Sequence, residues 1–125
     1  MGRIREFIEI DGKKCWTLFD SGARNTYVTP RVASLLATTE LPKPIKSALG
    51  GGVKKASQAA LLVARIEGRN VSTNAYVIKE IGRDEEGKEI DVLFGALAMQ
   101  QWGIRLVPKD ERLDLTHFPK EFVEY

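Results

Sequence analysis

An aspartate that ends an apolar, strand-like segment constrains this chain more than any other feature. Residues 14–19 alternate apolar and polar side chains, a pattern typical of a half-buried strand, and they lead directly into Asp20. A carboxylate buried alone is costly, so it needs hydrogen-bond donors, a second charge or a shared proton. Ser21 supplies a hydroxyl and Gly22 permits a sharp turn, which fits that need. The same residues are common in ordinary turns, so their role depends on the rest of the chain.

The composition is that of an ordinary folded domain. With 125 residues and 43% hydrophobic content, we expect a single domain over 1–125, in which 116–125 forms a C-terminal tail or arm. The net charge is only +2 and the Lys and Arg residues are scattered, so nucleic acid is not an expected partner. The longest apolar run is far shorter than a membrane span, so no membrane partner is expected either.

Cysteine and histidine are nearly absent, which narrows the possible chemistry. The single cysteine, Cys15, lies inside a strand pattern, cannot form an internal disulfide and is expected in the core. This cysteine usage suits a reducing compartment, and we expect a cytoplasmic protein. His117 is the only histidine. The chain therefore has almost none of the residues that Cys-His or Ser-His catalysis or a His-rich zinc site requires.

Many short strands separated by turns are predicted along the chain, with two short helices. The expected strands cover residues 3–10, 14–19, 25–28, 45–49, 53–56, 59–67, 71–78, 90–95, 104–107 and 112–115. The first helix is expected to begin at Pro30, after Thr29 as N-cap, and to end near 37–38; the second covers 96–102 and is closed by Gly103. Residues 82–89 form a charged loop. This pattern favours a small barrel or sandwich.

Glycines at two further positions predict unusual backbone geometry, a hairpin tip and a close approach of two backbone segments. Gly50, Gly51 and Gly52 separate two short strands and predict a flexible hairpin tip, which is either a loose surface turn or a mobile lid. Gly95 ends an apolar run, which predicts a central strand that meets another backbone there. In the tail, Phe118, Phe122 and Tyr125 follow at spacings of four and three; the segment is expected to dock on this subunit or on a partner.

Four of these features, in this order, resemble the retropepsin-like aspartic proteases, the single-domain type found in retroviruses and in many bacteria and archaea. Residues 19–23 match the hydrophobic-Asp-Ser/Thr-Gly-Ala motif, and 27–30 with the following helix resemble the bacterial members. The hairpin tipped by residues 50–52 lies where the substrate-covering flap belongs. Residues 92–95, a helix and then 103–106 match the second hydrophobic-hydrophobic-Gly motif and the closing strands.

The resemblance implies a mostly β fold, a small closed acid-protease-type β-barrel with one or two short helices, which dimerises through a two-fold axis. It also implies a homodimeric aspartic endopeptidase that cleaves an extended peptide or protein substrate, with no metal or organic cofactor. Because the chain has one Asp-Ser-Gly motif, each subunit would contribute one Asp20 at the axis. Two carboxylates at close range share a proton, so one would act as general base on water and the other would polarise the scissile carbonyl.

The resemblance assigns roles to three groups of residues. Ser21, Gly22 and Ala23 would support the active site, with the Ser21 hydroxyl joining the two active-site loops across the axis and the Gly22 carbonyl accepting from substrate. The covering flap would comprise Leu49, Gly50, Gly51, Gly52 and Val53. The second hydrophobic-Gly motif would be Leu93, Phe94 and Gly95.

The chain departs from the retroviral pattern at two places. Arg24 and Asn25 stand where retroviral enzymes usually carry acidic residues, so contacts to the substrate ends are expected to differ. Ala96 stands where retroviral members place an arginine that braces the dimer, so this chain would either assemble more like the bacterial members or hold its dimer by other contacts. Arg24 and Asn25 are therefore possible contacts to substrate or to the second subunit, and for Arg24 an ordinary surface ion pair is the alternative.

Two classes of function remain open on the sequence alone. One is the peptidase; the other is a dimerisation or peptide-binding module that keeps the fold but cleaves little or nothing. The intact Asp-Ser-Gly triplet and the glycine-rich flap favour the enzyme. Among the other acids, Asp91 is either a second catalytic group or, more simply, a strand-end residue facing solvent.

Overall fold

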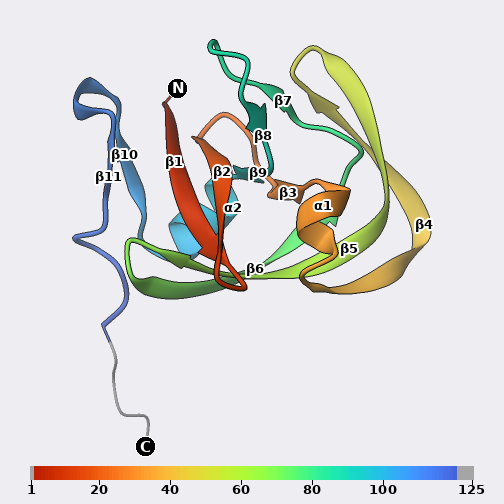
Figure 1. Ribbon diagram of the computed structural model, residues 1–125, viewed down its shortest axis with the longest axis horizontal. Coiled ribbons are helices and arrows are strands. Elements are labelled where there is room, and N and C mark those ends of the chain that lie inside the picture. The colour runs from red at the N-terminus through yellow and green to blue at the C-terminus, as the bar shows by residue number, and fades with distance from the viewer. Residues whose placement is uncertain (1, 121–125) are drawn as a thin grey trace, which may run out of the picture.

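The computed structural model describes residues 2–120, and its strands wrap around a common core (Figure 1). Strands β1 (Arg3–Ile10) and β2 (Lys13–Asp20) form the expected hairpin. Asp11 and Gly12 in its turn have φ values of 51° and 74°, the pair of positive values that a tight two-residue hairpin needs. The resulting register places Arg3 directly opposite Asp20.

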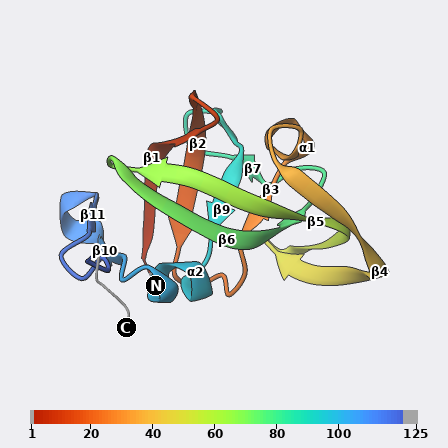
Figure 2. The ribbon, with the colours of Figure 1, turned by 90° about the horizontal axis from the view of Figure 1, so that it is seen from below.

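Seven strands form the main sheet, in the order β1-β2-β9-β3-β6-β5-β4. The other members are β3 (Tyr27–Val28), β4 (Ala37–Leu49), β5 (Gly52–Ile66), β6 (Arg69–Val77) and β9 (Val92–Phe94). A pairing between Glu9 of β1 and Arg65 of β5 brings the sheet back onto itself, so it closes as a barrel while β4 stays outside the ring as an edge strand. In Figure 2, β5 and β6 cross in front of β1, β2 and β9.

Short elements complete the chain. The helices are α1 (Pro30–Ala33) and α2 (Ala96–Gln101), and two small hairpins pair β7 (Gly82–Arg83) with β8 (Glu89–Ile90) and β10 (Arg105–Val107) with β11 (Arg112–Asp114). The predicted mostly β fold with two short helices is confirmed. Within residues 2–120, neither helix is long and apolar enough to cross a bilayer.

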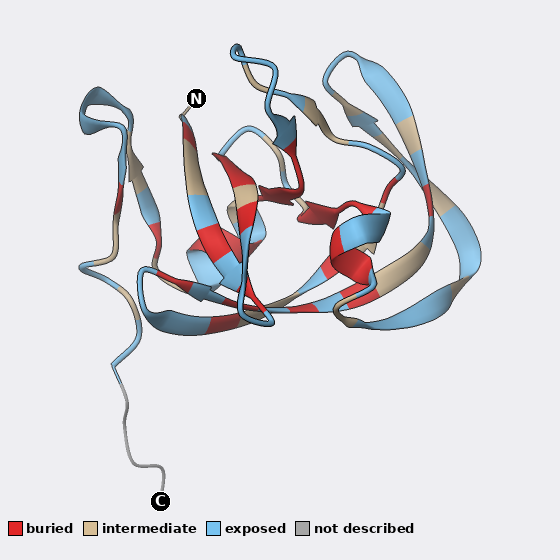
Figure 3. Cartoon of the chain, viewed as in Figure 1, coloured by how far each residue is buried: buried red, intermediate tan, exposed pale blue. Residues whose placement is uncertain are grey.

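The core lies on both faces of the strands that carry the site, as the distribution of buried residues indicates (Figure 3). On β2, Leu18 belongs to the cluster beneath the β4–β5 hairpin, whereas Phe19 belongs to the cluster inside the barrel. The parallel neighbour β9 repeats this arrangement with Leu93 and Phe94. Consecutive side chains of a strand point to opposite faces, and the apolar run of β9 fits burial on both. On β2 the residues from Thr17 to Asp20 are all buried, so the prediction of a half-buried strand is wrong at this end. Cys15 is buried in the core as expected.

The region after the first helix differs most from the sequence-based prediction. Helix α1 ends at Ala33 rather than near 37–38, and strand β4 begins already at Ala37. The residues from Ala37 to Glu40 pair with β5. The helical pattern of the neighbouring residues did not indicate this pairing, because it depends on a segment far away in the sequence. The two prolines of this segment, Pro42 and Pro44, fall where the register shifts between Glu40 and Ile45, and an edge strand tolerates their missing N–H groups.

Smaller differences concern strand limits. Residues 53–56 and 59–67, expected as two strands, belong to the single strand β5, and the charged segment 82–89 begins and ends in the small β7–β8 hairpin rather than being loop throughout. In the tail, Phe118 stacks on Trp102 with ring centroids 5.6 Å apart. The other two aromatic tail residues, Phe122 and Tyr125, lie outside the described residues.

Candidate active site

Asp20 stands at the end of β2 with only 6% of its surface exposed. Its Oδ1 accepts a hydrogen bond from the Gly22 N–H at 2.8 Å, and its Oδ2 lies 3.4 Å from Nε of Arg3. These two contacts offset part of the cost of removing a carboxylate from water. The neighbouring Ser21 faces the N-terminal segment: its Oγ accepts from the Gly2 N–H at 2.9 Å.

The loop that follows Asp20 is held against the start of α2. Three hydrogen bonds join them: Ala96 N–H to Ala23 O at 2.7 Å, Leu97 N–H to Arg24 O at 3.1 Å and Gly95 N–H to Thr26 Oγ1 at 3.0 Å. The close backbone approach expected at Gly95 is present, because a Cβ there would lie 2.1 Å from the Asn25 carbonyl oxygen. Gly95 therefore fixes the distance between the loop and the second hydrophobic-Gly segment.

A cavity of about 360 Å³ joins this loop to the β4–β5 hairpin. Its lining residues are Arg3, Asp20, Gly22, Ala23, Arg24, Asn25, Tyr27, Ser47, Ala48, Leu49 and Gly50. At the hairpin tip, Gly50 and Gly51 adopt φ values of 59° and 80°, which suit glycine and strain other residues. The carboxylate and the hairpin tip thus enclose one space, as a flap above a substrate groove would.

The predicted site residues fall into four places. Asp20, Gly22, Ala23, Arg24, Asn25, Leu49 and Gly50 share the cavity, and Gly51, Gly52 and Val53 continue the hairpin beyond its lining. Leu93, Phe94 and Gly95 lie in the core beneath it, and Ser21 turns toward Gly2. Sequence reasoning missed Arg3, Tyr27, Ser47 and Ala48. The position of Arg3 could have been predicted from the sequence, because the tight turn at residues 11–12 sets the strand register that places Arg3 opposite Asp20.

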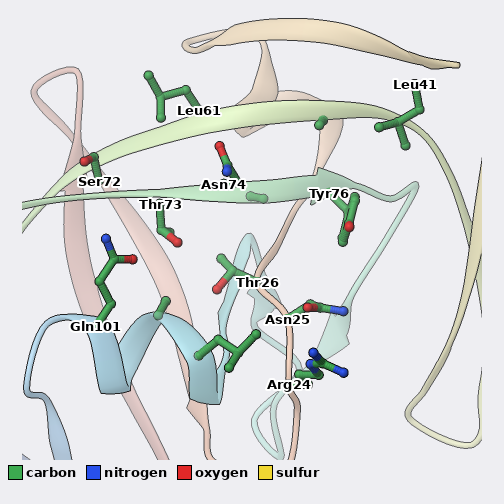
Figure 4. Close-up of a pocket in the computed structure, with 14 residues that line it drawn as sticks. Arg24, Asn25, Thr26, Leu41, Leu61, Ser72, Thr73, Asn74, Tyr76 and Gln101 are labelled. Carbon is green, nitrogen blue, oxygen red and sulfur yellow. The ribbon is translucent and has the colours of Figure 1, made fainter.

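A larger cavity of about 660 Å³ begins at Arg24 and Asn25 and extends over β6 and α2 (Figure 4). Arg24 and Asn25 lie side by side in it, and Gln101 of α2 and Thr73 of β6 contribute polar side chains. The two cavities share Arg24 and Asn25, so these residues stand where one space passes into the other.

Asp91 does not face solvent, and that expectation was wrong. Its exposed fraction is 5%, and its Oδ2 is paired with Nη2 of Arg31. The Asp91 backbone is bonded to the Trp16 carbonyl at 2.9 Å and to the Thr29 N–H at 3.1 Å, which holds the residue between β2 and α1. It does not line the cavity of Asp20, so it offers no second catalytic carboxylate there.

Among residues 2–120, only one acidic side chain, that of Asp20, lines the cavity beside the β4–β5 hairpin. Nor do the described residues contain any cluster of three His, Cys, Asp or Glu side chains placed to hold a metal ion. The chemistry available at this site in a single chain is therefore that of one carboxylate beside an arginine.

Comparisons with known proteins agree with this geometry. The aspartyl protease family profile matches residues 8–97. Among solved structures, the retroviral protease-like domain of Ddi1 from Leishmania major superposes with a TM-score of 0.65 at 16% identity, covering 94% of this chain and 91% of that one. The EIAV protease complexed with the inhibitor HBY-793 superposes with a TM-score of 0.60 at 17% identity, covering 84% and 92%. No curated protein sequence matches significantly.

Proposed function

Because this chain belongs to the retropepsin-like aspartyl protease family, we propose that it is a homodimeric aspartic endopeptidase. The observation that carries the proposal is the cavity between Asp20 and the β4–β5 hairpin, which has a catalytic-type carboxylate on one wall and a glycine-tipped flap on the other. A space of this form suits an extended peptide, whose backbone can pair with the strands around it.

The dimer follows from the number of carboxylates. An aspartic protease needs two, and each chain supplies one, so the site is complete only with a second copy related by a two-fold axis. The paired Asp20 side chains would share one proton, since two carboxylates at close range do not both ionise. Each side chain enters the pair already oriented by the N–H of Gly22.

In the proposed mechanism, the ionised Asp20 takes a proton from a water molecule that attacks the scissile carbonyl carbon. The protonated Asp20 of the second subunit donates its proton to the carbonyl oxygen, which gives a tetrahedral diol. The first Asp20 then passes the proton that it took from water to the leaving amine nitrogen as the C–N bond breaks, and the second Asp20 regains a proton from a diol hydroxyl as the carboxylic acid forms. The flap residues 49–53 close over the peptide and exclude water, and the Gly22 carbonyl accepts a hydrogen bond from the peptide backbone. Neither a metal nor an organic cofactor takes part.

Sedimentation and cleavage of an unfolded protein mixture, measured together between acid and neutral pH, test the proposal. We expect a dimer that cleaves, and a loss of at least about 100-fold in kcat/KM for Asp20→Asn with fold and dimer retained. A dimer that is inactive at every pH would support the alternative, a retropepsin-fold module for dimerisation or peptide binding. A strict monomer would refute the shared-proton mechanism.

We also propose a cytoplasmic location. The buried, free Cys15 is consistent with a reducing compartment of this kind.

A further inference from the structure

The charged side chains along the proposed substrate groove are positive, apart from the catalytic carboxylate. The cavity of Asp20 is lined by Arg3 and Arg24, and the larger cavity has Arg24 as its only charged lining residue. Arg3 is engaged by Asp20. Arg24 is exposed and forms no ion pair with any carboxylate of residues 2–120, so its guanidinium is available to a ligand.

The flap hairpin carries a second cation, Lys54, directly opposite a residue that lines this cavity. Residues 41–66 contain four lysines and no acidic residue. The register pairs Ser47 with Lys54 and Lys46 with Lys55, and directly opposed residues share a face of the hairpin. Ser47 lines the cavity and is partly buried. Lys54 is also partly buried, whereas Lys46 and Lys55 are both exposed. Lys54 therefore lies on the groove side and Lys55 on the outer side.

We propose that this groove selects peptides that carry Asp or Glu side chains on both sides of the scissile bond, with Arg24 and Lys54 receiving their carboxylates. The inference rests on the proposed peptidase function and names its substrate class. In a two-fold dimer each cation occurs once in each half of the groove, so the preference applies to both ends of the peptide. Arg24 is suited to this task because its guanidinium forms a planar, two-pronged contact with a carboxylate.

The preference applies to positions away from the scissile bond. Near the centre, the charge of Asp20 repels a substrate carboxylate, and Arg3 compensates for only part of it. Arg24 lines the cavity of Asp20 too, but it stands at the passage to a second cavity whose other lining side chains are uncharged (Figure 4). A carboxylate placed there meets one cation and no competing acid among the lining residues.

Binding to the catalytically blocked Asp20→Asn protein tests the inference without requiring cleavage. Two fluorescent peptides of about ten residues, long enough to cross the groove in extended form, differ only in carrying Glu or Lys at the positions flanking an apolar centre. We expect the Glu peptide to bind about tenfold more tightly by fluorescence anisotropy, and the difference to shrink as salt is raised. In the Asp20→Asn background, Arg24→Gln and Lys54→Gln should each reduce the preference several-fold, whereas the matched control Lys55→Gln should leave it unchanged.

Equal binding of the two peptides, or an equal loss in Lys55→Gln, would overturn the inference. The inference would also be overturned if Arg24→Gln sedimented as a monomer, because Arg24 would then be a contact between the subunits.

Two further outcomes separate a failure of this inference from a failure of the proposed peptidase function. If the wild type cleaves a peptide pool without enrichment of Asp or Glu around the cut sites, this inference fails and the peptidase stands. If the wild type cleaves nothing while the Asp20→Asn protein still prefers the Glu peptide, the groove preference stands and the peptidase fails.

Discussion

Replacing Gly95 by alanine tests how the active-site loop is held in place. The backbone of Gly95 has φ −91° and ψ 179°, which any residue can adopt, so alanine is penalised only by what its methyl group meets. That group would lie 2.1 Å from the Asn25 carbonyl oxygen and 2.9 Å from the Ala23 carbonyl oxygen. Ordinary carbon–oxygen contacts are longer than about 3.3 Å, so the loop has to move by about 1 Å.

The cost can be worked from the bonds that such a movement breaks. The loop is joined to the start of α2 by three hydrogen bonds of 2.7 to 3.1 Å, which a shift of this size weakens together. Each contributes about 1 kcal/mol, so we expect Gly95→Ala to lower the free energy of unfolding by about 3 kcal/mol. With a typical urea dependence this lowers the unfolding midpoint by about 1.5 M.

The assay is urea unfolding followed by tryptophan fluorescence, at several protein concentrations so that association is separated from folding. Gly52→Ala is the matched control, because its φ is not positive and its Cβ would meet only the Leu49 carbonyl oxygen at 3.9 Å. We expect the control to change the free energy of unfolding by less than about 1 kcal/mol. If Gly95→Ala behaves like the control, the loop is not held by close contact with this glycine and the reasoning is refuted.

Two further predictions concern acids away from the groove. Burial, and secondarily the neighbouring Glu67 carboxyl, raises the pKa of Glu6 to about 7, so folding favours the protonated side chain. The protonated Glu6 therefore contributes to the free energy of unfolding; this contribution is complete below about pH 4.5 and is lost as the pH rises through 7. Glu6→Gln should therefore be more stable than the wild type at pH 8, by about 1 kcal/mol after solvent screening, and equal to it at pH 4; a constant difference in urea unfolding would contradict this. Arg31→Met should cost about 2 kcal/mol by leaving the buried Asp91 carboxylate without its partner, less than for a fully buried pair because Arg31 is mostly exposed. Asp91→Asn, which removes that charge, should cost less in the same assay, and the reverse order would refute the pairing argument.

Much of the local structure could be predicted because it depends on a few neighbouring residues. The hairpin around residues 11–12 and the helix start at Pro30 were predicted correctly from turn and capping chemistry. Helix α2 ends at Gln101, one residue before the predicted end, and Gly103 follows its C-cap Trp102 as expected: Gly103 has φ 64°, and a Cβ there would lie 2.0 Å from the His117 carbonyl oxygen. The mostly β fold and the aspartyl protease family followed from the order of such local features.

Pairing between distant segments was harder to predict. Strand β4 was expected to begin only at Ile45, because its first half carries two prolines and its partner on β5 lies about 20 residues further along the chain. The burial of Asp91 was missed for the same reason, since its charge is balanced by Arg31 on a separate helix. The roles assigned to Asp20, Ser21 and the flap stay predictions that the proposed experiments address.

The sequence by itself determined where the chain turns, where its helices begin and which carboxylate follows an apolar strand. These features reflect backbone preferences and hydrophobic periodicity, which act over a few residues. Only the tertiary structure decided that Asp91 is buried against Arg31, that Lys54 rather than Lys55 shares a face of the hairpin with Ser47, and that Arg24 stands between two cavities. Those facts depend on strand register and on packing between segments far apart in the chain, and in the β4–β5 hairpin a register shift of one residue would turn the Lys54 side chain to the opposite face.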